Sequence, residues 1–136
     1  MKARDRTAKG VRPPLPRAPD EMRQWSELLL AEIVQWPQVT TRPMFGMTAV
    51  YHGNAIFGVL PRTRAMESAC SVSFKLPRHK PQLAKALAGD KRILLPREGA
   101  RWISFELRDG RDIADALAWF RRAYDAAAPS EVRHAA

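Results

Sequence analysis

Two short apolar runs joined by a tight-turn sequence constrain the fold of this chain more than any other segment. The runs are Thr48–Tyr51 and Ala55–Leu60, and His52-Gly53-Asn54 lies between them. These three residues tolerate the positive φ angles that a tight turn requires, so the segment predicts a β-hairpin. Both runs are apolar on both faces. This is typical of central strands, or of a sheet that is covered on one side and partly masked on the other.

The rest of the chain predicts three helices and three more strands. Apolar residues recur at helical spacing in three segments, which are 20–36, 79–88 and 111–127. Further strands are predicted at 71–76, 92–95 and 101–107. The order is therefore α-β-β-β-α-β-β-α. Short connections favour a mostly antiparallel five-stranded sheet with the helices packed on one face, a two-layer α+β fold.

The strand predicted at 71–76 alternates between apolar and polar residues. Val72, Phe74 and Leu76 fall on one face, and the other face holds Ser71, Ser73 and Lys75. This pattern predicts a half-buried strand whose polar face meets solvent.

At the last helix, Asp109 and Asp112 fit the N-terminus, where capping and negative charge are favourable.

Charge divides the chain into a basic tail and a domain that is only mildly basic. The net charge is +9 over 136 residues, of which +5 belongs to residues 1–19 and +4 to residues 20–136. We expect 1–19 to be a disordered, Pro-rich tail with weak, salt-sensitive attraction to polyanions. A single domain is predicted at 20–128, with a flexible C-terminal tail at 129–136.

The sequence offers little catalytic or metal-binding chemistry. Cys70 is alone, so neither an intramolecular disulfide nor a Cys-rich metal site can form. The three histidines lack metal-ligand spacing and are expected to be exposed, and no Gly-rich phosphate loop is present. No apolar run approaches the roughly 18 residues that cross a bilayer. We therefore expect a cytoplasmic, non-enzymatic protein with no cofactor, no metal and no membrane partner.

The segment Arg42-Pro43-Met44-Phe45-Gly46-Met47 has the most distinctive composition in the chain. Gly46 permits a backbone conformation or a close approach that a side chain would block. Met44 and Phe45 are large and apolar, so at least one is expected to be buried against the first helix. Met47 either fills core space or places a flexible apolar side chain at the surface. The motif is thus either structural or a binding site.

Five features of the chain carry a resemblance to a known family, namely the first helix, Arg42-x-Met44-Phe45-Gly46, the hairpin to Leu60, the strand with Lys75 and the aromatic strand before the last helix. Together they resemble the N-terminal domain family of the TfoX competence regulators. The resemblance covers about residues 20–127. It implies an α+β fold related to YjbR-like and secretion-chaperone-like architectures. It also implies a regulatory association, with no established enzymatic activity and no cofactor.

Two hypotheses of function follow, and a third is weaker. The first is a regulatory or protein-interaction module that binds a protein partner or associates with itself. In this hypothesis Trp36 or Trp119 contacts the partner. Trp119 could instead cover the edge of the core. The alternative is a nucleic-acid-binding accessory protein that uses its tail and basic residues for polyanion contact, namely Arg62, Arg64, Lys75 and Arg101. The third, a small-ligand binder or enzyme, would need a deep pocket with convergent polar groups.

Overall fold

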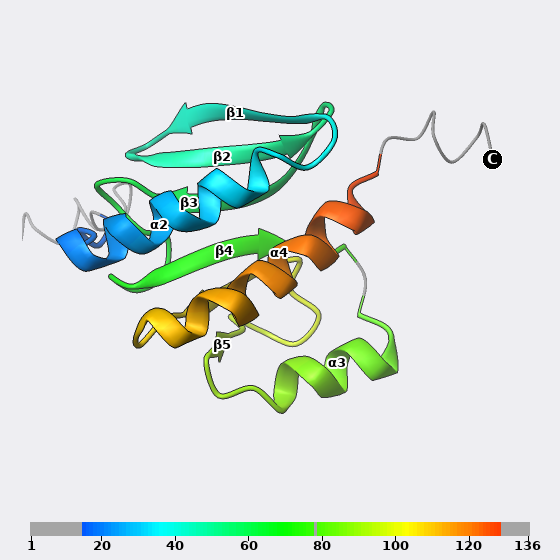
Figure 1. Cartoon of the computed structure of the whole chain (residues 1–136). Coiled ribbons are helices and arrows are strands. Elements are labelled where there is room, and N and C mark those ends of the chain that lie inside the picture. The colour runs from blue at the N-terminus through cyan, green and yellow to red at the C-terminus, as the bar shows by residue number, and fades with distance from the viewer. Residues whose placement is uncertain (1–14, 78, 129–136) are drawn as a thin grey trace, which may run out of the picture.

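The computed structural model describes residues 15–77 and 79–128 as an α+β fold with two layers (Figure 1). Six strands form one antiparallel sheet in the order β1-β2-β3-β4-β6-β5, and helices α2 and α4 cover one of its faces. The elements are α2 (Asp20–Ile33), β1 (Val39–Met44), β2 (Met47–His52), β3 (Ala55–Pro61), β4 (Ser71–Lys75), α3 (Pro81–Ala88), β5 (Ile93–Leu94), β6 (Trp102–Glu106), the 3₁₀ turn η1 (Gly110–Asp112) and α4 (Ile113–Ala126). The predicted two-layer α+β class is confirmed, with six strands instead of five. The predicted tails lie outside the described residues, except for residues 15–19.

The sixth strand is β1, which the sequence pattern missed. It pairs with β2 along its whole length, from Val39 opposite His52 to Met44 opposite Met47. Its four central residues are exposed because the strand lies at the edge of the sheet, so no apolar alternation marks it. Pro43 lies within β1, where a proline is tolerated because the strand is at the edge of the sheet.

The predicted helices are longer than the observed ones. Helix α2 ends at Ile33 and not at Trp36, α3 begins at Pro81, and a 3₁₀ turn precedes α4. The predicted capping of this last helix is confirmed, since Asp109 and Asp112 form a reciprocal capping box around η1.

Within the described residues, no helix is long and apolar enough to cross a membrane.

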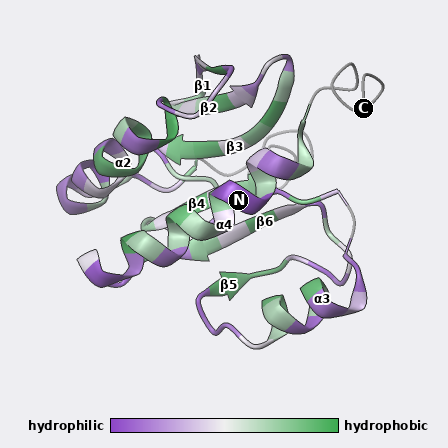
Figure 2. Cartoon of the chain, turned by 45° about the vertical axis from the view of Figure 1, so that its right-hand side comes forward, coloured by the Kyte–Doolittle hydropathy of each residue, from purple (hydrophilic) through white to green (hydrophobic). Residues whose placement is uncertain are grey.

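The main core lies between the sheet and helices α2 and α4. Four phenylalanines are fully buried in it, namely Phe57, Phe74, Phe105 and Phe120. Burying such a side chain contributes about 1.5–3 kcal/mol. Gly58 lets α4 approach the sheet, because a Cβ there would lie 2.3 Å from Cε1 of Phe120. Figure 2 shows β3 in the hydrophobic colour over most of its length, as expected for a strand beneath both helices.

Strand β4 is buried on both faces, so the prediction of a half-buried strand was wrong. Ser71 and Ser73 are each 1% exposed. The hydroxyls of Ser73 and Ser104 lie 2.8 Å apart and hydrogen-bond across β4 and β6. Polar side chains that satisfy each other can be buried, which is why alternation alone misjudged this face.

An ion-pair network joins the β5 edge to α4. Arg92 Nε donates to Asp90 at 2.9 Å, and Arg92 Nη1 lies 2.7 Å from Asp112 and 3.0 Å from Asp115. Its guanidinium also covers the Phe105 ring, 4.7 Å from the centroid. These carboxylates are therefore structural partners of one arginine.

Candidate functional site

The Met44–Met47 segment forms the turn of the β1–β2 hairpin. Met44 and Met47 are opposite each other, so Phe45 and Gly46 are the two central residues. Their φ angles are 49° and 81°, both positive, as in a type I′ turn. Gly46 adopts this conformation freely. For Phe45 the left-handed region is strained, at a cost of about 1 kcal/mol or more.

The strained Phe45 side chain is exposed to solvent. It is 80% exposed, the highest value among the large hydrophobic residues that the structure describes as exposed. Met44 is half-buried, so the prediction that Met44 or Phe45 would be buried against the first helix was wrong. Met47 is the buried residue of the motif, at 2% exposure, and it fills interior space. An exposed aromatic ring on a strained turn marks this tip as a candidate contact site.

The loop after β3 is fastened to the hairpin turn through the carbonyl of Gly46. This oxygen accepts hydrogen bonds from the backbone N–H groups of Arg62, Thr63 and Arg64, at 3.1, 2.9 and 3.1 Å. A Cβ at position 46 would lie 2.8 Å from both the Arg64 side chain and Thr63 Oγ1. Gly46 is therefore required by close approach as well as by φ, and it fixes the backbone of Arg62 beside the tip.

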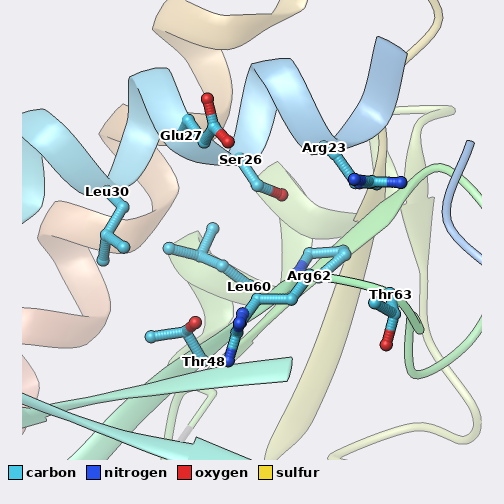
Figure 3. A pocket seen from close by; sticks show the side chains of 9 residues that line it. Arg23, Ser26, Glu27, Leu30, Thr48, Leu60, Arg62 and Thr63 are labelled. Carbon is cyan, nitrogen blue, oxygen red and sulfur yellow. The ribbon is translucent and has the colours of Figure 1, made fainter. Parts of the chain in front are cut away.

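A pocket of about 250 Å³ lies next to this turn, between α2 and the ends of β2 and β3 (Figure 3). Its lining combines three apolar side chains with charged groups and hydroxyls, namely Leu30, Leu60, Pro61, Arg23, Arg62, Glu27, Ser26, Thr48 and Thr63. Figure 3 shows Ser26 and Leu30 pointing from α2 toward the strands, and Arg62 running across the pocket toward Thr48. We call the pocket together with residues 43–46 the tip surface.

Ser26 and Arg62 are among the pocket residues whose side-chain polar groups have no partner within residues 15–77 and 79–128. Ser26 Oγ is buried without a hydrogen bond, and the residue is 5% exposed. A helical serine usually satisfies its hydroxyl on the preceding turn. The exposed Arg62 guanidinium also makes no ion pair or side-chain hydrogen bond within residues 15–77 and 79–128. Arg23, in contrast, contacts Asp20 at 3.1 Å.

The four residues predicted for polyanion contact do not converge. Arg62 and Arg64 follow β3 beside the beginning of β4, whereas Lys75 ends β4 and Arg101 precedes its partner strand β6. The two pairs thus lie at opposite ends of β4. Arg64 is also half-buried and donates from Nη1 to the Leu15 carbonyl at 2.9 Å, which is a structural contact.

The two tryptophans proposed as partner contacts pack into the protein. Trp36 is half-buried, stacks on Phe57 at 6.4 Å and is covered by Arg121. Trp119 is 8% exposed and stacks on Phe74 at 5.7 Å. Trp119 therefore belongs to the core, and the exposed aromatic residue is Phe45.

Histidine and cysteine offer no catalytic arrangement in the described part of the chain. His52 is buried at 8% exposure, with Nδ1 2.9 Å from the Tyr124 carbonyl, so its predicted exposure was wrong. Burial raises the pKa of the Cys70 thiol above its usual range, and the charges of Glu106 and Glu21 add to this. This is the opposite of the lowered pKa that a nucleophilic cysteine needs. Residues 15–77 and 79–128 hold no group of three or more His, Cys, Asp or Glu that could bind a metal ion.

No protein-family model, curated protein or solved structure matches this chain. The resemblance to the TfoX N-terminal domain therefore stays a prediction, and any proposal of function depends on the site itself.

Sequence reasoning found the motif and Arg62 but missed the pocket. One signal was available, because Ser26 interrupts the apolar stripe of α2, four residues after Met22 and three before Leu29. A serine on the buried face of a helix is unusual and needs a partner. Thr48 gave no such signal, since threonine is common in strands.

Proposed function

We propose that this protein is a non-enzymatic interaction module that binds another protein through the tip surface. The main support is Phe45, whose ring is 80% exposed on a strained turn. An exposed aromatic side chain with few rotatable bonds is the type of residue that dominates protein interfaces. The adjoining pocket offers an aliphatic wall and unpaired polar groups, which suit the polar contacts of such an interface.

We infer an acidic partner rather than a second copy of this chain. The chain carries a net charge of +9, and the residues of 20–136 alone account for +4. Arg62 lies on the tip surface without a counter-ion among the described residues. Two copies of a chain with a net charge of +9 repel each other, whereas an acidic protein is attracted.

The alternative is nucleic-acid binding. It was based on arginines and lysines that fall on one face, but the described positions lie at opposite ends of β4. A basic strip beside stacking aromatic residues would be needed for single-stranded nucleic acid. This alternative therefore has less support than the protein partner.

Photo-crosslinking tests the proposal. The photoreactive analogue p-benzoylphenylalanine replaces Phe45 in the full chain in cells, and a matched variant carries it at Leu28, which is 60% exposed on α2. We expect a specific protein adduct from position 45 that position 28 does not give. The purified partner should then bind Phe45→Ser about 30-fold more weakly than wild type, as expected for an interface hot spot of about 2 kcal/mol.

Three outcomes would contradict the proposal. The first is an equal pattern of adducts from positions 45 and 28. The second is an adduct that joins two copies of this chain, which would indicate self-association. The third is an identified partner whose affinity falls equally with Phe45→Ser and Leu28→Ser, because the tip would then contribute nothing of its own.

A further inference from the structure

We propose that the pocket of the tip surface binds a carboxylate that carries a short aliphatic group, as at the C-terminal residue of a protein chain. This inference rests on the proposed function, because it identifies the part of the partner that the tip surface recognises. It depends on three observations about the pocket, which are its size, its unpaired polar groups and its aliphatic wall.

The size of the pocket fits one terminal residue. Its volume is about 250 Å³. A dry cavity of about 150 Å³ accommodates benzene, so this pocket takes a group of about ten non-hydrogen atoms. Pockets for cofactors and drug-sized ligands begin at about 300 Å³. A nucleotide is therefore too large, whereas a single amino-acid residue fits.

The unpaired polar groups fit a carboxylate. Arg62 presents a guanidinium with no counter-ion among the described residues, and a carboxylate can accept two parallel hydrogen bonds from it. Ser26 Oγ lies buried in the wall with no partner, so it can donate a further hydrogen bond. A buried hydroxyl without a partner is costly, which favours a ligand that satisfies it.

The charge of the lining favours a carboxylate over a phosphate. Glu27 also lines the pocket but makes no ion pair with Arg62. Arg23 is held by Asp20 at 3.1 Å. Because Arg62 and Glu27 offset each other, the lining gives a second negative charge no additional attraction, and the greater cost of desolvating a phosphate dianion then favours a carboxylate.

The aliphatic wall fits a branched apolar side chain. Leu30 is half-buried on α2, and Leu60 lies on the β3 side of the pocket (Figure 3). Pro61, at the end of β3, also lines the pocket. Leu60 and Pro61 are already buried, so a leucine or valine side chain against this wall would remove from water its own apolar surface and that of Leu30. The pocket therefore distinguishes a chain end with an aliphatic residue from one with a polar residue.

A titration of the full chain, followed by NMR, tests the proposal. The probes are the acetylated tripeptide Ala-Ala-Leu with a free C-terminal carboxylate, the same peptide as the C-terminal amide, 4-methylpentanoate and inorganic phosphate. We expect the free acid to shift the amide resonances of Ser26, Arg62 and Thr63. The amide should bind at least about tenfold more weakly, because the charge-assisted hydrogen bonds are lost.

Four variants separate the pocket from general charge. Arg62→Gln and Ser26→Ala should each weaken binding of the free acid about tenfold or more, as expected for a lost hydrogen bond to a charged group. Glu27→Gln should tighten binding of the free acid two- to threefold, because it removes one like charge near the surface. Arg101→Gln removes one positive charge at the other end of β4 and should leave the affinity within about twofold.

Equal binding of acid and amide would overturn the proposal, as would equal effects of Arg62→Gln and Arg101→Gln. Tighter binding of phosphate would also overturn it. If 4-methylpentanoate bound as tightly as the free-acid tripeptide, the pocket would be a site for a small free acid, and the proposal that it recognises the end of a protein chain would be overturned.

If a partner crosslinks at position 45 but the tripeptide does not bind, this inference fails and the proposed function stands. If the tripeptide binds and no partner is found, the proposed function fails.

Discussion

At the scale of single residues, Phe45 combines a strained backbone with a side chain that contributes little to the core. Its φ is 49° and its exposure is 80%. Asparagine adopts the left-handed region at lower cost, and Asn-Gly is the preferred pair in a type I′ turn. We therefore expect Phe45→Asn to raise the free energy of unfolding by about 1 kcal/mol, measured by urea denaturation. Leu28→Asn is the control and should lower it by a few tenths to about 0.7 kcal/mol through helix propensity. A loss of stability in Phe45→Asn would show that the ring is needed within this chain.

Ser26 carries a second prediction at the same scale. Its hydroxyl is buried without a partner, so Ser26→Ala removes a desolvated polar group and should raise stability by about 1 kcal/mol. Ser73→Ala is the matched control, because Ser73 is also buried but hydrogen-bonds Ser104 at 2.8 Å. That change should lower stability by about 1 kcal/mol or more. Thermal denaturation of both variants checks the pair, and equal losses would contradict the absence of a partner at Ser26.

At the scale of elements, the Arg92 network makes stability depend on pH. The Arg92 hydrogen bond lowers the pKa of Asp90 below 3.8. Burial raises the pKa of Asp112, but backbone N–H groups and Arg92 outweigh it, and the pKa also falls below 3.8. Groups with a lowered folded-state pKa stabilise above the unfolded pKa and lose this contribution as pH falls through the folded one.

Arg92→Met should therefore lower the free energy of unfolding by about 2 kcal/mol at pH 7, because it leaves partly buried carboxylates without their partner. The difference from wild type should shrink below about pH 3.5, where the carboxylates become protonated. Urea denaturation of both proteins across this pH range measures it. Arg111→Met is the control, since Arg111 is 91% exposed and pairs with Asp109 on its own turn. A pH-independent difference for Arg92→Met would contradict the network.

Elements with a buried face could be predicted, and so could the short edge strand β5, whereas the edge strand β1 could not. The sheet, α2 and α4 followed from apolar periodicity, because each presents a stripe to the core. Strand β1 was missed because residues 40–43 are exposed at the edge of the sheet. The pocket was missed for another reason, since its lining comes from α2 and from segments around residues 48 and 60–63 that only the fold brings together.

At the scale of the whole molecule, residues 1–14 hold +4 of the net charge of +9. Residues 1–14 carry five basic side chains and one acidic one, whereas residues 15–18 belong to the fold, since Ala18 N–H donates to the Thr63 carbonyl at 2.9 Å. Deleting 1–14 therefore removes charge without removing this contact. We expect weak binding to duplex DNA by the full chain, with an affinity that falls steeply with salt.

The salt dependence then shows which residues contact a polyanion. Each phosphate contact contributes about 0.9 to the slope of log affinity against log salt, so the deletion should lower the slope by up to about 4. Arg62→Gln and Arg101→Gln should each lower it by less than 1, because their sites lie at opposite ends of β4 and cannot form one groove. Binding to the free-acid tripeptide should show the reverse pattern, with a loss in Arg62→Gln and no change on deletion. If the deletion left the slope intact while both arginine variants reduced it, the folded domain would be the polyanion-binding part and the nucleic-acid alternative would be preferred.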